Sequence, residues 1–484
     1  MILRNQTDNL TVTKNFITNN WTVGFVFLDA SGGVNSPVQT ALNCTFRDNF
    51  VGVLSHNANW TFVNCTFLRN NMGEVHLTKI GAGVWCWRSR SVFRGCSFRD
   101  SYTGIAVDNS TCTATGCSFL QNEVGGVFVC GFMSYQDPEY VGPCGPSDTT
   151  VEDCEFIGNV YGIARGIEGW LGTEELHVEN GVFRDNTVFG IWWENRIDPG
   201  TKYQPAPSWE LKPQATWNVT GASEVAGDLM RFNGSINVGS GGSLDLRRSV
   251  LVMDGALVGE TGIQVRSGGK LTAAEGSTLM AADPRWPYSL ACRPGSALLL
   301  EDSLLRDCGW NPAVPNQSGP YIETTEAVIR RMVVEGCPTA LVMKGAGKGL
   351  VEGSRLFGKY LAVRLDNSSL ELVNSTAGSA GDSKAALVNG SRLVCLNSSL
   401  DREHVELQDY ESRLEIGWYL DVLALWSDGR PAAGAGLTIQ DALSDEVQNG
   451  SVDAAGRARG IVLWEAFLTA ANSTGFSPHR LECR

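Results

Sequence analysis

Aromatic side chains recur beside carboxylates in this sequence, at positions that suit contact with sugar rings. Trp85, Phe128 and Trp192 each follow an apolar residue in a short run that alternates as a strand does. If the apolar residue points inward, the aromatic residue points outward, where its flat ring can stack on a sugar. The alternative is that the loop 131–148 or the proline-rich stretch after residue 195 covers these rings. The predicted ligand-binding residues are Trp85, Trp87, Asp108, Phe128, Trp192 and Glu194.

Two carboxylates in the longest insertion form an alternative catalytic pair. Asp137 and Glu139 stand in the run Asp137-Pro138-Glu139-Tyr140. Enzymes that cleave or epimerise polysaccharides need clustered carboxylates together with Arg, Lys or His. The run resembles the Asp-Pro-His run of mannuronan C5-epimerases, but the histidine is missing. We therefore expect no catalytic site, and Asp137 and Glu139 are kept as the alternative.

The histidines give no sign of a metal site, because they share no ligand spacing typical of transition metals. A calcium site built from the glutamates between positions 168 and 175 is an alternative, but solvated loop carboxylates explain these residues more simply. We expect no metal and no cofactor. The five histidines are His56, His76, His177, His404 and His479.

The 14 cysteines do not look like a disulfide framework. Most of them recur at one position of a repeat, where a cysteine is a small apolar side chain pointing inward. Cys130 and Cys144 differ, because they flank a loop rich in Gly, Pro and Asp, and we predict a disulfide between them.

A short phrase repeated at a period of 21 residues determines the predicted fold. Asn43-Cys44-Thr45-Phe46-Arg47-Asp48-Asn49 returns as Asn64-Cys65-Thr66-Phe67-Leu68-Arg69-Asn70, and later copies contain Cys96, Cys117 and Cys154. Cys and Phe at i and i+2 lie on one face of a strand. A period in the twenties without helical periodicity indicates a repeat architecture of short strands. We predict a right-handed parallel β-helix in which equivalent residues of successive coils stack about 4.8 Å apart.

Changes in the repeat divide the chain. The first β-helix segment covers 1–195, and a connector with several prolines covers 196–216. Copies built on Gly-Gly-Ser-Leu follow in a second β-helix segment, 217–412. The repeat phrase is already present at Asn15-Phe16-Ile17-Thr18-Asn19-Asn20, so we expect further residues before Met1.

The last part of the chain, 413–484, alternates like the strands of a small antiparallel sandwich. Asp428, Gly429, Pro431, Gly434 and Ala435 match the Asp-Gly-x-Pro-x-x-Gly-Ala run of carboxypeptidase-regulatory-like and collagen-binding-B-type modules. The segment resembles these immunoglobulin-like modules. The order of the segments is similar to that of large archaeal cell-surface proteins with parallel β-helix repeats, and this resemblance implies a surface protein without implying an activity.

Charge and glycosylation motifs bear on partners and compartment. A net charge of -14 argues against nucleic acid and anionic lipid as partners. The sequence contains no run of 18 apolar residues, so it predicts no membrane span. Sixteen Asn-x-Ser/Thr sequons favour an exported glycoprotein, although Asn at a bend followed by Thr on a strand is also what the repeat requires. The sequons begin at Asn5, Asn9, Asn20, Asn43, Asn59, Asn64, Asn109, Asn218, Asn233, Asn316, Asn367, Asn374, Asn389, Asn397, Asn449 and Asn472.

The sequence therefore predicts an all-β, exported cell-surface β-solenoid glycoprotein without catalytic activity. We expect it to act as a spacer, an adhesin or a carbohydrate-binding rod, with a polysaccharide or another surface protein as partner. Its open ends would allow self-association. The alternative is a polysaccharide lyase, epimerase or glycosidase built on the same β-helix.

Overall fold

The computed structural model describes residues 7–8, 11–13, 23–28, 38–71, 73–75, 78–129, 147–165, 175–193 and 215–484. The chain forms two compact units, Met1–Ser289 and Leu290–Arg484. The expected connector lies outside the described residues up to position 214, and a strand begins at Ala215. The expected segment boundaries stay a prediction.

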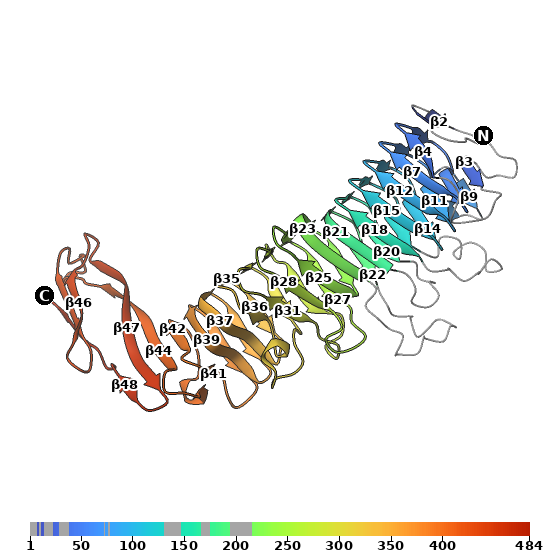
Figure 1. The fold of residues 1–484 in the computed structure, drawn as a ribbon. Helices are drawn as coiled ribbons and strands as arrows, with labels where there is room; N and C mark the ends of the chain where they lie inside the picture. The colour runs from blue at the N-terminus through green and yellow to red at the C-terminus, as the bar shows by residue number, and fades with distance from the viewer. Residues whose placement is uncertain are drawn as a thin grey trace. The chain divides into compact units, whose positions relative to one another are not determined.

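One coil of the first unit contains three short strands. In the coil that starts at Ala82 these are β11 (Ala82–Trp87), β12 (Arg90–Arg94) and β13 (Ser97–Arg99). Each pairs in parallel with the equivalent strand one coil later, so that Val84 faces Ile105 and Phe98 faces Phe119. Figure 1 shows these strands as stacked arrows. The coil is therefore a rung of a parallel β-helix, as the period predicts.

The three strand positions build three parallel ladders in the first unit. The first ladder contains β1 (Thr7–Asp8), β4 (Gln39–Leu42), β7 (Asn59–Val63), β12, β15 (Thr111–Thr115), β18 (Asp148–Glu152), β21 (Glu175–Arg184), β23 (Ala215–Ala226), β25 (Gly234–Val238) and β28 (Gly262–Val265). The second contains β2 (Thr11–Thr13), β5 (Thr45–Arg47), β8 (Thr66–Leu68), β13, β16 (Ser118–Leu120), β19 (Glu155–Ile157), β21, β23, β26 (Ser243–Arg247) and β29 (Lys270–Ala274). The third contains β3 (Val23–Leu28), β6 (Val51–His56), β11, β14 (Thr103–Asp108), β17 (Gly125–Val129), β20 (Tyr161–Arg165), β22 (Phe189–Trp193), β24 (Leu229–Phe232), β27 (Val250–Met253) and β30 (Thr278–Ala281). A separate hairpin joins β9 (Gly73–Val75) to β10 (Thr78–Ile80).

The corners between strands explain the polar residues of the repeated phrase. In the coil of β11 the corner residues Arg88, Gly95 and Asp100 all have a φ near +50° to +60°. Asn, Asp and Gly adopt this left-handed conformation at the least cost. The phrase therefore places one such residue before its cysteine and another after its phenylalanine strand.

The inward side chains form continuous stacks. Successive Phe rings from Phe46 to Phe183 lie 4.7–5.1 Å apart between centroids and within 9° of parallel. The cysteines of the phrase are buried free thiols in a parallel row, and the amide of Cys117 donates to Sγ of Cys154 at 3.3 Å. The predicted inward stacking is confirmed. The stacked phenylalanines are Phe46, Phe67, Phe98, Phe119, Phe156 and Phe183.

A row of glycines leaves space for these rings. A methyl group on Gly126 would lie 2.7 Å from the carbonyl oxygen of Gly162 and 2.7 Å from a ring carbon of Phe156. Carbon atoms do not approach other atoms this closely. Glycine is therefore required where the strand of the third ladder passes beside the phenylalanine stack.

Substitution of Phe67 tests the stack. We expect Phe67→Ala to lower the free energy of unfolding by roughly 3–5 kcal/mol, because it removes a fully buried ring and leaves a cavity between two rungs. Urea unfolding measures the change. Phe357→Ala is the control, because Phe357 is 40% exposed, and an equal loss in both variants would contradict the stacking argument.

A buried row of asparagines runs beside the phenylalanine stack. The backbone and side-chain amides of Asn122 both donate to Oδ1 of Asn159, at 3.0 and 2.9 Å. Nδ2 of Asn159 in turn donates to the carbonyl oxygen of Phe119 at 2.9 Å. Each rung thereby provides hydrogen-bond partners for the buried polar groups at the corner of the neighbouring rung. The row contains Asn49, Asn70, Ser101, Asn122, Asn159, Asn186 and finally Asp228.

Asp228 replaces the amide of the row with a carboxylate. Both of its oxygens accept hydrogen bonds from Asn186, at 2.6 Å each. Burial raises the pKa of the Asp228 carboxyl to about 6, against a usual value of 3.8, although the bonds from Asn186 act in the opposite direction. The folded state therefore binds a proton more readily than the unfolded chain, and ionisation of Asp228 opposes folding.

We predict that Asp228→Asn stabilises the first unit at neutral pH. An asparagine at this position can make the same hydrogen bonds as the earlier asparagines of the row, and it carries no charge to bury. The free energy of unfolding of the wild type should equal that of Asp228→Asn below about pH 4, and it should fall below that of the variant as pH rises through about 6. Thermal unfolding of both proteins between pH 4 and 7.5 measures it, with Asp245→Asn, a partly exposed carboxylate, as control. A pH-independent difference between Asp228→Asn and wild type would contradict the assignment.

The second unit also contains three parallel ladders. Serines replace the asparagine row: the amides of Ser354 and Ser375 donate to Oγ of Ser375 and Ser398, both at 3.0 Å. The first two ladders contain β31 (Ser289–Cys292), β34 (Tyr321–Ile322), β37 (Thr339–Glu352), β39 (Leu361–Val373), β41 (Ala385–Val388), β43 (Val405–Leu407), β32 (Ala297–Glu301), β35 (Glu326–Arg330), β42 (Arg392–Leu396) and β44 (Arg413–Leu423). The third contains β33 (Leu304–Arg306), β36 (Val333–Glu335), β38 (Arg355–Gly358) and β40 (Thr376–Ser379), and the short helices are η2 (Pro315–Gln317) and η3 (Arg402–His404).

The parallel ladder of the second unit ends at β44. This strand pairs in parallel with β42 and antiparallel with β47 (Arg457–Thr469), which also pairs with β48 (Ser473–Gly475). A second antiparallel sheet contains β45 (Gly436–Gln440), β46 (Glu446–Ser451) and β49 (Arg480–Cys483). Leu437, Ile439 and Ile461 form the buried cluster of this region. These strands are antiparallel, as the sequence predicts, and the immunoglobulin-like assignment stays a prediction.

Candidate functional site

The predicted ligand-binding residues fall on the third ladder of the first unit. Val84, Ile105, Val127 and Ile191 are all buried, with at most 1% of each exposed, so the residue after each points away from the interior. Trp85 and Trp87 lie on β11, Asp108 ends β14, Phe128 lies on β17 and Trp192 on β22. Glu194 lies outside the described residues.

The first aromatic cluster is formed at the ends of three neighbouring strands. His56, Trp87 and Asp108 occupy equivalent positions on β6, β11 and β14. The rings of His56 and Trp87 stack at 4.4 Å, and those of Trp85 and Trp87 lie 6.0 Å apart and 10° from parallel. Nε1 of Trp85 donates to Oδ2 of Asp108 at 2.7 Å.

Burial corrects the expectation of an open strip at this cluster. Trp85 is 6% exposed, because it packs in a buried cluster with Phe50, Val51, Ala82 and Ala106, and Asp108, which accepts the indole N–H, is 8% exposed. Trp87 is half-buried. Burial and the nearby Arg88 lower the pKa of His56, which favours its neutral form. The first cluster is therefore better suited to fixing the strand ends than to stacking on a ligand.

The second aromatic cluster lies on β20 and β22. The ring of Tyr161 lies 5.6 Å from that of Trp192 and 6.1 Å from that of Phe189, and Phe189 lies 6.1 Å from Trp192. The three rings lie 11–26° from parallel, and all three side chains are half-buried. We call these residues the Tyr161 cluster. Sequence reasoning identified Trp192 but missed Tyr161 and Phe189, which the register of β20 on β22 brings together.

The predicted catalytic pair and disulfide cannot be placed by the structure. Asp137, Glu139, Cys130 and Cys144 all lie outside the described residues, in the stretch 130–146. The described cysteines are free thiols. Burial raises the pKa of Cys86, Cys292, Cys337 and Cys395 to about 12 each, so these thiols stay protonated and are poor nucleophiles.

The sequons fall into three structural groups. Asn59 and Asn233 are buried, at 7% and 1% exposed, and this burial argues against a glycan on either side chain in the folded chain. A second group occupies left-handed corners, where asparagine serves the backbone: Asn43, Asn64, Asn109, Asn367, Asn374, Asn389 and Asn397. Asn218, Asn316, Asn449 and Asn472 are exposed, and Asn5, Asn9 and Asn20 lie outside the described residues.

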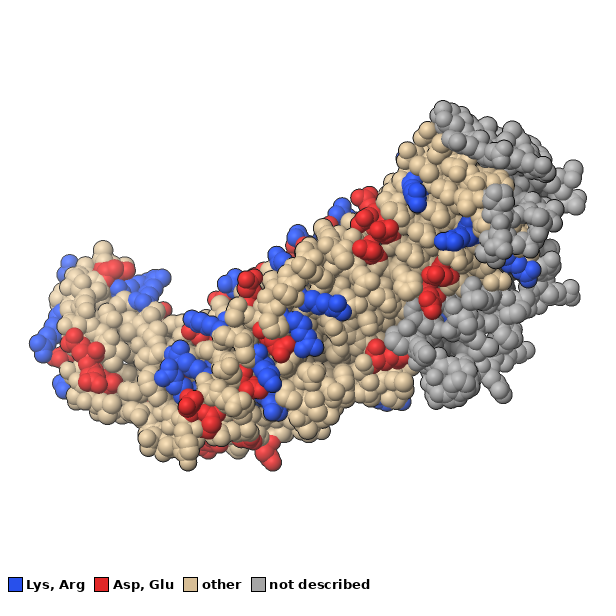
Figure 2. Space-filling view, viewed as in Figure 1, with Lys and Arg blue, Asp and Glu red and all other residues tan. Residues whose placement is uncertain are grey.

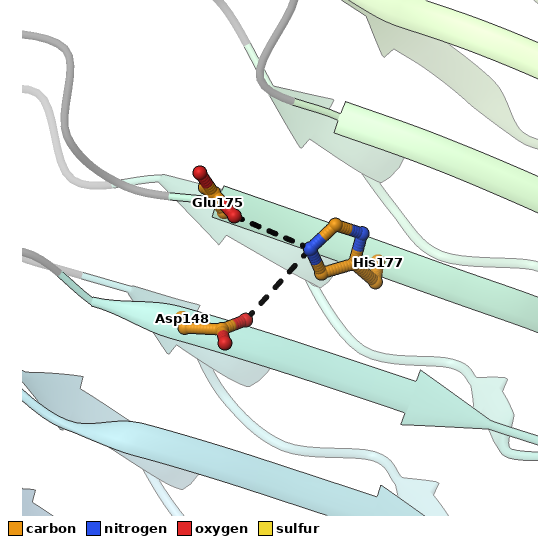
Figure 3. A group of neighbouring side chains, drawn as sticks. All are labelled: Asp148, Glu175 and His177. Carbon is orange, nitrogen blue, oxygen red and sulfur yellow. Dashed lines mark ion pairs between the residues drawn. The ribbon is translucent and has the colours of Figure 1, made fainter.

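A histidine between two carboxylates lies on the outer face of the first ladder. Nε2 of His177 lies 3.4 Å from Oε2 of Glu175 and 3.9 Å from Oδ1 of Asp148. Figure 3 shows one imidazole nitrogen joined by dashed lines to both carboxylates, which come from the neighbouring strands β21 and β18. All three side chains are exposed by about half. Sequence reasoning missed this group because Asp148 is distant in sequence, although alignment of the repeat would have placed it beside Glu175.

The charges around this group differ from those of two pairs in the second unit. Residues that face each other on neighbouring strands carry opposite charges there: Arg330 with Glu352 at 3.2 Å, and Lys344 with Asp366 at 3.6 Å. Arg392 and Arg413 also face each other, but both pair with Glu415. Basic and acidic side chains lie next to one another on the face shown in Figure 2. On β18 and β21, Asp148 faces Glu175, and Glu152 faces Glu179. Like charges facing each other across strands are unfavourable.

Comparison with known proteins supports the fold. Residues 1–196 match the family described as the right handed beta helix region, which is less than half of the chain. With the parallel ladders of both units, this match confirms the predicted all-β, right-handed parallel β-helix. No curated protein is similar in sequence at a significant level.

The solved structures that match this chain are distant from it. A hyper-glycosylated fragment of TibA has 11% identity and a TM-score of 0.19, over 83% of this chain and 96% of its own. A mutant tailspike protein of E. coli bacteriophage HK620, in complex with a pentasaccharide, has 10% identity and a TM-score of 0.25, over 94% and 87%. The Dettilon tailspike protein has 10% identity and a TM-score of 0.19, over 92% and 68%. At these scores the likeness carries no functional argument.

Among the described residues, no helix has the length and apolar character of a membrane span.

Proposed function

We propose that this chain is a non-catalytic, exported β-solenoid of a cell surface that binds a polysaccharide through the Tyr161 cluster. The observation that carries the proposal is a set of three near-parallel, half-buried aromatic rings on two neighbouring strands. Aromatic faces complement the C–H faces of sugar rings, and such contacts need little side-chain entropy. A polysaccharide offers several sugars to a surface of this kind.

The surrounding structure supports this use of the cluster. Ile163 and Ile191 anchor β20 and β22 in the interior, and Trp193 next to Trp192 is 1% exposed. The rings are thus fixed to a rigid scaffold before any ligand arrives, which lowers the cost of binding. The net charge of -14 disfavours polyanions, so a neutral polysaccharide is the preferred ligand class.

The termini of the ladders bear on the proposed spacer role and on self-association. In the second unit β47 pairs antiparallel with β44 along most of its length, so the last parallel strand already has a partner on that side. A second copy cannot extend the parallel ladder there. The antiparallel region at 413–484 would thus act as an immunoglobulin-like cap on this ladder, whereas β43 and β40, the last strands of the other two ladders, pair in the described ladders with β41 and β38 alone.

We predict that Trp192→Ala and Tyr161→Ala each weaken binding to a neutral polysaccharide roughly tenfold, because each removes one ring from the stacking surface. Affinity gel electrophoresis against a panel of neutral and uronic-acid polysaccharides measures the effect. Trp418→Ala is the matched control, because Trp418 is a 43% exposed tryptophan of the second unit. Equal binding by all three variants, or no binding by wild type to any member of the panel, would refute the proposal.

The same panel separates binding from catalysis. Accumulation of unsaturated ends or reducing sugar in the wild-type incubation would establish the enzymatic alternative instead. Loss of that product in Asp137→Asn and Glu139→Gln would then assign the activity to those carboxylates.

The exported glycoprotein part of the proposal has its own prediction. When the chain is produced in a secretory host, we expect a glycan on Asn316, which is exposed within η2 and outside the ladders. Folded protein should carry no glycan on Asn233, which is buried. Mass spectrometry of tryptic glycopeptides measures both. Occupied Asn233 in soluble, folded protein would contradict the burial argument.

A further inference from the structure

We propose that Asp148, Glu175 and His177 bind a divalent transition-metal ion, with zinc as the best fit, on the outer face of strands β18 and β21. This site is independent of the proposed sugar-binding surface. The ion would link two neighbouring coils and keep open coordination positions toward solvent.

The ladder fixes the spacing of the three ligands. Asp148 faces Glu175 across the pair of strands, and His177 lies two residues after Glu175 on the same face. The ligand atoms of the three side chains all lie within 4.8 Å of one another. Their backbones belong to regular strands, so the arrangement is formed before an ion arrives (Figure 3).

The donor set suits zinc. Zinc binds imidazole nitrogen and carboxylate oxygen at about 2.0–2.2 Å, which places neighbouring ligands of a tetrahedral ion about 3.4 Å apart. The separation of His177 Nε2 from Glu175 Oε2 is 3.4 Å, and that from Asp148 Oδ1 is 3.9 Å. The three ligand atoms lie within 4.8 Å of one another, so the two carboxylates would have to move closer together on binding the ion. Calcium and magnesium prefer oxygen ligands alone, so the histidine selects against them.

The electrostatics of the two strands favour a bound cation independently of the histidine. Two like-charge pairs face each other directly here. Glu224 and Asp245 also face each other on β23 and β26, but each of them pairs with an arginine at 2.7 Å. Glu152 and Glu179 accept hydrogen bonds from Thr115 and Thr220, at 3.1 and 3.0 Å. Asp148 and Glu175 instead share the imidazole of His177 as their neighbour, and a divalent ion would neutralise both carboxylates.

Titration of the metal-free protein with zinc chloride, followed by isothermal calorimetry, tests the site. We expect saturable binding in wild type and affinity weaker by on the order of tenfold or more in His177→Ala, Asp148→Asn and Glu175→Gln, since each loses a ligand. His404→Ala is the matched control, because His404 is an exposed histidine that pairs with Asp401 at 2.8 Å. Protons compete with metal for imidazole, so binding should also weaken in acid.

Cysteine ligation must be separated from this site, because Cys483 is an exposed thiol. Cobalt(II) provides the distinction: nitrogen and oxygen ligands give weak visible bands, whereas thiolates add intense charge transfer in the near ultraviolet. We expect the weak bands in wild type and in Cys483→Ser, and their loss in His177→Ala. Equal zinc affinity in wild type and His177→Ala, thiolate bands abolished by Cys483→Ser, or no binding by folded protein up to millimolar zinc would each overturn the proposal and leave a surface ion pair only.

Discussion

The in-register stacking of one coil on the next is the constraint on which the rest of this structure depends. Backbone hydrogen bonds of the parallel ladders set the distance between rungs, and every side chain then meets its equivalent one coil later. A residue type that packs well against a copy of itself is therefore repeated. Phenylalanine rings stack in parallel, cysteine thiols form a row, and asparagine amides bind one another. Packing against a copy of itself, more than hydrophobicity alone, determines which residue type recurs at each position of the repeat.

The corners impose the complementary constraint. A coil of 21 residues closes only if the chain turns sharply three times, and each turn uses a residue in the left-handed region. In the coil after β11 these residues are Asn109, Gly116 and Gln121. Gln121 is a costlier choice than Asn or Gly, and the buried Asn122 beside it, bonded to Asn159 and to the carbonyl of Phe98, holds the corner in place. The strain of one residue is thus offset by the bonds of the next.

These two constraints explain how much of the fold the sequence could predict. Copies with Cys and Phe two residues apart indicated which side chains point inward, and the rows through Cys117 and Phe119 confirm it. The asparagine row was missed, because Asn70 and Asn122 read equally well as exposed bend residues, and only the closed corner shows that they are buried. The antiparallel end at β44 could be located from the change in pattern, but nothing in the sequence indicates that β44 also completes the parallel ladder.

The outer surface was harder to predict for a physical reason. An inward residue has one environment, set by the rungs above and below, whereas an outward residue depends on whatever else reaches it. Trp85 and Trp192 occupy equivalent strand positions, yet Trp85 is almost fully buried against Asp108 and Trp192 joins Tyr161 and Phe189 in a half-buried cluster. Both clusters combine residues distant in sequence, as does the group around His177. Each such neighbour follows, however, from aligning the copies of the repeat, because insertions change the coil length: Trp87 and Asp108 are 21 residues apart, whereas Asp148 and Glu175 are 27 apart. In a solenoid, functional groups are therefore best sought by reading across the rungs rather than along the chain.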